Sequence, residues 1–403
     1  MGVLLISQVF YPDQVAVSNL FTKLFGSIAQ NNDIDINVWC AQPSYTILKR
    51  QPRKTNFSGL KINYLTSTNF PKDRFMGRLV NVFTFGLSVV FRLIFYRRKD
   101  VIVVHTTPPF LAILVICIAK LKRRKVIYVL MDIFPDGLIR LGKVSGKNIF
   151  IKFWKYWHKR TLIKSDRIVT IGRDMANWVL EEVPSIKKTN QLRFLPLWQD
   201  EKLINPIDFS NNPFVVKHEL AGSFVVQFSG NMGLWNDLET IGKAVAQKPD
   251  GVMFVFIGDG IRKNELLKAI GDNDGGNTLF FSFLDNADYA NSVTACHCGL
   301  VTLRPEAVGM GVPSKIIGIL AAGTPVLAIA PKGSEIANIV IENNCGIVIE
   351  PGDYNELVGA INYLKSNESE RQKMGLNART AFEKEFSTII AANNYYNLIK
   401  ELV

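Results

Sequence analysis

The chain has 403 residues, which predicts two domains of about 200 residues each, and its globular composition excludes a disordered or low-complexity protein. Its net charge of +12 is uneven, because residues 1–200 carry 31 Lys and Arg against 12 Asp and Glu, whereas the remainder is acidic. The basic first half predicts contact with an anionic surface, and without a nucleic-acid recognition motif no nucleic acid is expected as a partner.

The N-terminal sequence and the cysteines indicate a reducing, cytoplasmic setting. The apolar start, MGVLLISQVF, has no basic leader and is expected to be a first strand and not a signal peptide. The five cysteines are scattered and odd in number, which is typical of buried thiols. Cys296 and Cys298 flank His297 like half of a metal site, but no second pair exists, so no metal is expected.

In chain order, the first half alternates apolar strands with helices, a pattern that predicts a parallel sheet covered by helices. A polar loop, FYPDQVAVSN, follows the first strand. The expected strands are 3–9, 34–40, 60–65, 101–105, 126–131, 168–171 and 192–195, and the expected helices are 18–30, 75–96, 110–121 and 147–164.

The segment 75–96 is apolar and long enough to suggest a transmembrane helix. However, Asn81 and Arg92 lie inside it, Arg74 and Arg97 flank it, and the αβ pattern continues on both sides. These features favour an amphipathic helix that lies on a membrane or packs partly in the domain. A helix wholly inside the domain is the alternative.

The helix expected at 147–164 interleaves basic residues with aromatic ones. This combination suits the lipid headgroup region, although a charged face exposed to water has the same pattern. If the first interpretation holds, Lys152, Lys155 and Lys159 contact anionic lipid.

Residues 199–213 are polar and contain proline, which predicts a linker before a second αβ series. The last helix is expected to cross back onto the first domain. The predicted fold class is therefore α/β, with two Rossmann-like, doubly wound domains at 1–199 and 206–385 that face a central cleft, and a terminal helix at 386–403. The expected strands of the second half are 224–230, 253–258, 279–284, 298–301, 326–330 and 345–349, and helices are expected to end near 247, 270, 322, 364 and 402.

The stretch 301–330 is the most informative part of the second half. A strand leads into a loop that contains Arg304 and Glu306, then Pro313-Ser314-Lys315 opens a helix that Gly323 ends. Strand, glycine-rich loop and helix start form a common phosphate site, in which Ser314 is expected to cap the helix and Lys315 to add a cation. We interpret it as a site for the diphosphate of a nucleotide-sugar, with an ordinary αβ crossover as the alternative.

Eight short strings occur in order along the chain: FYPD, HTTPPF, DIFPD, FLPLWQD, SGNMG, FIGDG, the SK-helix-AAGTPV segment and GIVIEPGD. Together they resemble glycosyltransferase family 4, which has the GT-B fold, and within it the bacterial polysaccharide branch of fucosamine-transferase-like enzymes. The resemblance implies retaining transfer from a nucleotide-diphosphate sugar without a metal or other cofactor. It also implies that the donor binds mainly on the C-terminal domain and the acceptor on the N-terminal domain.

The resemblance implies roles for particular residues. Two departures from the family pattern are that the loop GNMGLWND has no cation, and that Gly318 stands where many members have an acid that holds the ribose. More of the diphosphate binding is therefore expected of Arg304 and Lys315. The catalytic candidates are Asp132, Glu306 and Lys315; the donor-binding candidates are Gly230, Asn231, Gly233, Gly258, Asp259, Leu284, Arg304, Gly309, Ser314 and Lys315; the acceptor-side candidates are Tyr11, Asp13 and Ala16.

The sequence therefore predicts a hexosyl- or N-acetylhexosaminyl-type glycosyltransferase that acts in O-antigen or capsule synthesis. Its expected donor is a UDP-linked sugar, with an N-acetylated amino or deoxy sugar as the candidate, and its expected acceptor is a lipid-linked saccharide at the inner face of the cytoplasmic membrane. A GT-B-fold sugar-nucleotide 2-epimerase and a non-catalytic nucleotide-sugar-binding subunit are the alternatives. The helix start after SGNMG is expected to help bind the diphosphate.

Overall fold

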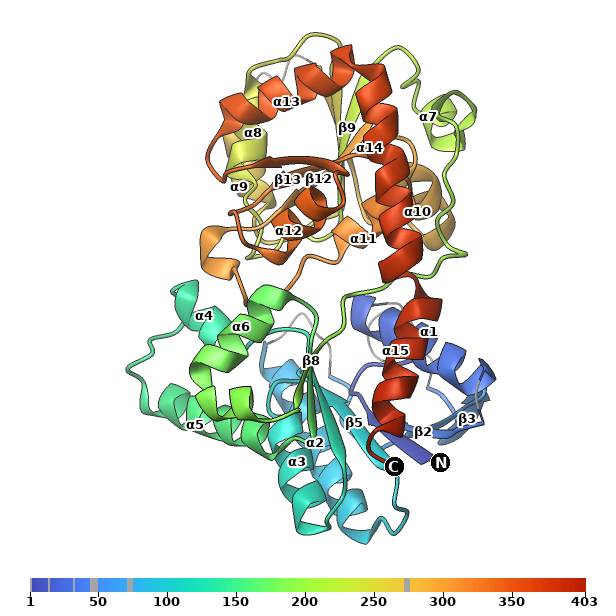
Figure 1. The fold of residues 1–403 in the computed structure, drawn as a ribbon, viewed down its shortest axis with the longest axis vertical. Coiled ribbons are helices and arrows are strands. Elements are labelled where there is room, and N and C mark those ends of the chain that lie inside the picture. Colours follow the sequence, from blue (N-terminus) through green and yellow to red (C-terminus); the bar gives the residue numbers. More distant parts are fainter. Residues whose placement is uncertain (1, 14, 32, 44–49, 71–74, 272–275) are drawn as a thin grey trace. The chain divides into compact units, whose positions relative to one another are not determined.

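The computed structural model describes residues 2–13, 15–31, 33–43, 50–70, 75–271 and 276–403. Arg74, which was expected to flank the long apolar helix, lies outside the described residues, as does Gln14 in the loop after the first strand. The chain divides into two compact units, Met1–Pro196 with Thr388–Val403, and Leu197–Ser387 (Figure 1).

The N-terminal unit is built on one sheet. In the described part of the chain its strands are β1 (Gly2–Ile6), β2 (Asp35–Cys40), β3 (Lys54–Phe57), β4 (Leu60–Tyr64), β5 (Val101–His105), β6 (Val126–Leu130), β7 (Arg167–Thr170) and β8 (Leu192–Phe194). They lie in the order β3-β4-β2-β1-β5-β6-β7-β8. All neighbours pair in parallel except the edge strand β3, which is antiparallel to β4 and was not expected from the sequence.

Helices cover this sheet, so strands such as β5 and β6 are buried at every position. The chain's last helix contacts α1 and so belongs to this unit (Figure 1). The helices are α1 (Ala16–Asn31), α2 (Phe75–Phe95), α3 (Leu111–Leu121), α4 (Asp136–Arg140), α5 (Ile149–Lys164), α6 (Arg173–Glu182) and α15 (Thr388–Lys400), with a 3₁₀ turn at Pro184–Lys188.

The C-terminal unit contains an all-parallel sheet. Its described strands are β9 (Phe224–Ser229), β10 (Val252–Ile257), β11 (Thr278–Phe281), β12 (Cys298–Thr302), β13 (Val326–Ile329) and β14 (Gly346–Ile349). They lie in the order β11-β10-β9-β12-β13-β14. Counted along the chain this is the order 3-2-1-4-5-6, whose direction reverses between β9 and β12, and ligands of such sheets bind beyond the carboxyl ends of the strands at that reversal.

Helices also pack on this second sheet, and residues such as Phe254, Leu300 and Ile361 form its core. The predicted Rossmann-like α/β organisation is therefore found in both units. The helices are α7 (Pro213–Lys217), α8 (Glu239–Ala246), α9 (Lys263–Ile270), α10 (Asn286–Val293), α11 (Lys315–Ala321), α12 (Glu335–Glu342), α13 (Tyr354–Ser366) and α14 (Glu368–Ala381), with 3₁₀ turns at Phe209–Asn211 and Pro305–Ala307 and a π-helical turn at Phe382–Phe386.

Candidate functional site

Two glycine loops meet at the carboxyl ends of β9 and β10. A Cβ on Gly258 would lie 2.3 Å from the carbonyl oxygen of Gly230, and one on Gly260 would lie 2.4 Å from that of Met232. The Met232 amide also donates to the Asp259 carbonyl at 2.9 Å. These glycines are therefore required for the two loops to pack together, and their packing places the backbone of the SGNMG loop beside α11.

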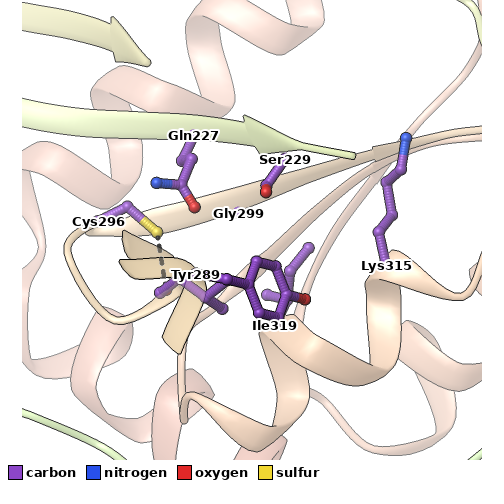
Figure 2. Close-up of a pocket in the computed structure, with 8 residues that line it drawn as sticks. Gln227, Ser229, Tyr289, Cys296, Gly299, Lys315 and Ile319 are labelled. Atoms are coloured by element: carbon purple, nitrogen blue, oxygen red, sulfur yellow. Dashed lines mark hydrogen bonds between the residues drawn. The ribbon is translucent and has the colours of Figure 1, made fainter. Parts of the chain in front are cut away.

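Lys315 is the first residue of α11, and its side chain extends towards the end of β9 (Figure 2). Its Cε lies 3.5 Å from the Cβ position of Gly230, and its Nζ lies 3.7 Å from the centre of the Phe228 ring. Burial lowers the pKa of Lys315 to about 7 and is the only cause of the shift, so no neighbouring charge in the described chain compensates the ammonium. An anionic ligand would supply that compensation.

Asn236 holds this ammonium in place, and the sequence analysis missed it. The Lys315 ammonium donates to Asn236 Oδ1 at 3.0 Å, and Asn236 Nδ2 donates to the carbonyls of Asn231 and Gly233, each at 3.3 Å. Thr302 at the end of β12 donates to the same Oδ1 at 3.2 Å. One buried amide thus links Lys315 to the SGNMG loop. Its sequence signal was weak, because a single Asn in a loop shows no periodicity.

Arg304 and Glu306 follow β12 directly. The Arg304 amide donates to the Trp235 carbonyl at 2.8 Å, which joins this loop to the one after β9. Arg304 Nε lies 3.3 Å from Glu306 Oε2, an ion pair without hydrogen-bond geometry. This Oε2 is buried and accepts no hydrogen bond from the described residues. A ligand hydroxyl could satisfy it, as could water.

The expectation that Ser314 caps α11 is wrong, and the residues at the start of α8 are unfavourable for the anion expected there. Ser314 makes no side-chain cap bond, because it has helical dihedral angles (φ −64°, ψ −18°) and not the extended ones of a capping residue. At the start of α8, Asp237 Oδ1 already accepts the Thr240 amide at 3.2 Å. An acidic residue, Glu239, also occupies the first turn of α8, so this helix start does not favour a diphosphate.

The remaining donor-side candidates lie in the same loops or next to them. Asn231 and Asp259 are exposed, and Asp259 Oδ1 accepts the Gly260 amide at 2.7 Å. Gly309 has φ +75° and is buried, which fits a glycine requirement in the loop between β12 and α11. Leu284 packs against an apolar cluster that contains Val255 and Ile257 of β10, and no described contact joins it to Lys315.

Gly318 lies one turn along α11 from Lys315, and its missing side chain has a structural explanation. A Cβ at this position would lie 2.6 Å from the Tyr289 hydroxyl. Tyr289, Lys315 and Ile319 line one small cavity together with Ser229 (Figure 2). Tyr289 therefore occupies the space that a longer residue at 318 would need, and burial raises the pKa of its hydroxyl to about 12, so it is neutral.

In the N-terminal unit, Asp132 follows β6. Its amide and that of Met131 donate to Thr106 Oγ1, at 3.2 and 3.1 Å, which ties the ends of β5 and β6 together. Burial raises the pKa of Asp132 to about 6. Asp132 does not cap the following helix, because α4 begins after Pro135 without a side-chain cap bond.

The acceptor-side candidates surround the loop after β1. The Tyr11 ring stacks on Phe57 at 3.8 Å between centroids, its carbonyl accepts the Tyr64 hydroxyl at 2.7 Å, and Asp13 is buried. Ala16 is exposed as the first residue of α1. Tyr11 and Asp13 therefore pack within the loop. The small side chain of Ala16 leaves the backbone at the start of α1 open to solvent.

Cys296 and Cys298 are placed as ordinary thiols. Cys298 is buried, Cys296 donates to the Val293 carbonyl at 3.5 Å, and His297 Nδ1 accepts the Val225 amide at 3.0 Å. Burial raises the pKa of both thiols, which disfavours the thiolate form that binds metals.

Comparisons with known proteins agree with this geometry. Residues 213–381 match the family of glycosyl transferases group 1, a range that lies within the C-terminal unit. The probable glycosyltransferase WbjE of Pseudomonas aeruginosa is 28% identical over 82% of this chain and 81% of its own length. The putative colanic acid biosynthesis glycosyl transferase WcaI of Escherichia coli is 25% identical over 70% of this chain and 71% of its own length.

Solved structures resemble the whole chain in fold. Sucrose-phosphate synthase from Thermosynechococcus elongatus matches with a TM-score of 0.75 and 16% identity, covering 100% of this chain and 99% of that one. Anabaena HepE, solved in complex with UDP-glucose, matches with a TM-score of 0.72 and 16% identity and covers 100% of both chains.

Proposed function

The chain is a glycosyltransferase of the GT-B fold with a glycosyl transferases group 1 domain, and we propose that it moves a sugar from a nucleotide-diphosphate donor to a lipid-linked saccharide during bacterial polysaccharide synthesis. The observation that carries the proposal is Lys315. Its ammonium is uncompensated by any described charge and lies at the reversal point of the C-terminal sheet, next to the backbone of the SGNMG loop.

The diphosphate binds at Lys315 in this proposal. Negative charge grows on the leaving diphosphate as the bond to the sugar breaks, and a fixed cation that faces it lowers the barrier. Because Asn236 and Phe228 already orient the ammonium, little reorganisation is needed when the charge develops. Arg304 adds a second, more exposed cation in the loop after β12.

The donor sugar is held by Glu306 in this proposal, because its buried Oε2 has no hydrogen-bond donor in the described chain and a sugar hydroxyl can supply one. Asp132 serves the chemical step on the acceptor side, where its pKa of about 6 lets it exchange a proton near neutral pH. Transfer proceeds with retention and without a metal.

UDP is the proposed nucleotide, and its sugar is an N-acetylated amino or a deoxy hexose. The likeness in fold to HepE, which was solved with UDP-glucose, supports the choice of UDP. The likeness to the putative colanic acid biosynthesis glycosyl transferase WcaI supports a place in bacterial polysaccharide assembly, and O-antigen or capsule is the proposed product.

The proposed location is the inner face of the cytoplasmic membrane, with the enzyme bound peripherally through its basic N-terminal unit. The net positive charge of residues 1–200 supports this, since the cytoplasmic leaflet carries anionic lipids. Part of the charge of this unit is paired within it, since Lys155 is ion-paired with Asp136 at 2.5 Å and Lys159 with Glu182 at 2.6 Å.

A transfer assay with a radiolabelled UDP-sugar and a bacterial membrane lipid extract tests the function. The proposal predicts label in the lipid fraction and an equal release of UDP. A 2-epimerase would convert the donor without labelling lipid, and a non-catalytic subunit would bind UDP-sugar without either reaction. Lys315→Met, which removes the charge but keeps the apolar stem, is the matched control.

A further inference from the structure

Helix α2 packs on its unit through a partly polar face. Asn81 is buried and makes two hydrogen bonds to the backbone of Phe70. Its side chain accepts from the Phe70 amide and donates to the Phe70 carbonyl, each at 2.9 Å. Thr84 Oγ1 accepts the Thr68 amide at 3.0 Å. Phe85 and Val89 are fully buried on the same side. The face towards the protein therefore uses hydrogen bonds as well as apolar contacts.

The opposite face of α2 is apolar and exposed to solvent. Its residues follow helical spacing of three and four, so they form one stripe along the whole helix. Phe83 is 65% exposed and Phe91 is 68% exposed, values far above those of core residues. The stripe consists of Met76, Leu79, Val80, Phe83, Leu87, Phe91, Ile94 and Phe95. This is the reverse of an ordinary surface helix, which turns its apolar side inward.

The apolar surface continues over two neighbouring helices. Helix α3 contacts both α2 and α5, and Leu114 of α3 and Phe110 just before the helix are exposed. Phe110 packs on Trp154 of α5 with ring centres 4.3 Å apart. Helix α5 in turn exposes Phe150 and Phe153. An exposed apolar area on three adjacent helices marks an interaction site.

The chain segment that carries this surface is strongly basic, although Lys120 and Lys125 pair with Asp166 and Lys159 pairs with Glu182. Residues 74–165 contain 19 Lys and Arg but only three acidic residues, and α2, α3 and α5 contain no acidic residue. Arg92 turns away from the stripe, stacking over Trp39 at 5.1 Å. The Lys122 ammonium bonds to the Leu93 carbonyl at 3.1 Å, so it satisfies backbone groups at the end of α2.

We propose that α2 lies in the plane of the membrane, with its stripe among the acyl chains and the surrounding Lys and Arg at anionic headgroups. This proposal rests on the peripheral location proposed above. It attributes membrane binding mainly to insertion of the apolar stripe and only secondarily to charge. Charge complementarity selects the occupant: a second copy of this chain would bring two strongly basic faces together, whereas anionic lipid neutralises them.

A membrane-spanning α2 is the other possibility, since Met76–Phe95 is long and apolar enough to cross a bilayer. Spanning would detach Asn81 from Phe70 and leave an amide with two broken hydrogen bonds in the hydrocarbon region. The in-plane position keeps these bonds and places only the exposed stripe in lipid.

The test is flotation of the full chain with phosphatidylcholine vesicles, with or without phosphatidylglycerol, at salt concentrations from low to high. No nucleotide is added, so the result does not depend on the transferase reaction. The double variant Phe83→Ser with Phe91→Ser should bind at least about 100-fold more weakly, because burying one Phe is worth more than about a factor of ten. The matched control, Val216→Ser with Leu376→Ser, alters exposed apolar residues of the other unit and should bind like the wild type.

High salt should weaken wild-type binding to anionic vesicles without abolishing it, because salt screens charges but not apolar insertion. The double variant Lys147→Glu with Lys152→Glu should weaken binding to vesicles that contain phosphatidylglycerol but not binding to pure phosphatidylcholine vesicles. Activity on a water-soluble acceptor should survive the double Ser variant, which separates this proposal from the transferase assignment. Equal flotation of the double Ser variant and the wild type, retention in the pellet after carbonate, or a wild-type dimer that the double Ser variant dissociates would each overturn the proposal.

Discussion

Replacing Lys315 by methionine should weaken both nucleotide binding and turnover. Among the described residues the ammonium has two neutral acceptors, Asn236 Oδ1 at 3.0 Å and the Asn231 carbonyl at 3.5 Å, and it lies over the Phe228 ring. No described carboxylate pairs with it, so a bound diphosphate would be its anionic partner. A hydrogen bond to a charged group is worth about 1.5–3 kcal/mol, which corresponds to a loss of about 10- to 100-fold in UDP affinity. Turnover should fall by about 100-fold or more, the effect of removing one fixed transition-state donor.

The pH dependence of UDP binding gives this prediction a second readout. The pKa of Lys315 is lowered to about 7 in the free protein, so the binding-competent ammonium is present below pH 7 and is lost above it. Wild-type affinity should therefore fall between pH 7 and 9 relative to Lys315→Met, and the variant corrects for ionisation of the nucleotide itself. The free energy of unfolding should change with pH in the opposite direction to UDP affinity. Between about pH 7 and 10 the folded state binds fewer protons than the unfolded state, so the destabilisation caused by Lys315 becomes smaller as the pH rises.

Calorimetric titration with UDP and a transfer assay measure the two effects. Lys268→Met, which removes an exposed lysine of α9, is the control for a general loss of positive charge and should leave both unchanged. Unchanged UDP affinity together with unchanged turnover in Lys315→Met would refute the assignment of this residue.

Three further predictions concern single residues. Glu306→Gln should raise the KM for the donor sugar nucleotide while free UDP binds nearly as before; equal losses for both ligands in calorimetry would place Glu306 elsewhere. Asp132→Asn should lower turnover without changing UDP affinity, and normal turnover would exclude the chemical role. Because burial raises the pKa of Asp132 to about 6, the variant should have a higher melting temperature than the wild type at pH 7 but not at pH 4. Gly318→Ala should destabilise the protein by about 1–3 kcal/mol, because its Cβ would lie 2.6 Å from the Tyr289 hydroxyl. In a denaturation series, adding Tyr289→Phe should restore most of the lost stability, whereas additive losses would show that the hydroxyl is not the cause.

The sequence predicted the fold well because buried parallel strands are continuous apolar runs. Strands such as VIVVH and VIYVL are buried at every position and were recognised within a residue of their ends. The edge strand β3, with the sequence KTNF, was missed because one side of it is exposed and its residues are polar. Edge strands carry little hydrophobic signal.

The site was predicted only in part, for a similar reason. Lys315 and the glycines follow strand ends and open a helix, a pattern visible in one dimension. Asn236 acts through contacts with residues distant in the chain, and the Tyr289 hydroxyl matters because it fills the space beside Gly318. Such placement depends on how loops and helices pack, which local spacing does not encode.

Side-chain direction was the least predictable property. Hydropathy identified α2 as an apolar helix but could not show that its apolar stripe faces outward while Asn81 and Thr84 bond to the protein. In the same way, composition could not show that Lys155 and Lys159 form ion pairs with Asp136 and Glu182.

The central claim is that this chain transfers a sugar from a nucleotide-diphosphate donor to a saccharide acceptor with retention. The direct measurement is NMR of the reaction with a UDP-sugar and a lipid-linked acceptor extract, following UDP release and the anomeric configuration of the product together. The account predicts one UDP released for each sugar transferred, with the donor's anomeric configuration kept and both signals reduced by about 100-fold or more in Lys315→Met. An inverted product, an epimerised donor, or UDP release with transfer only to water would contradict it.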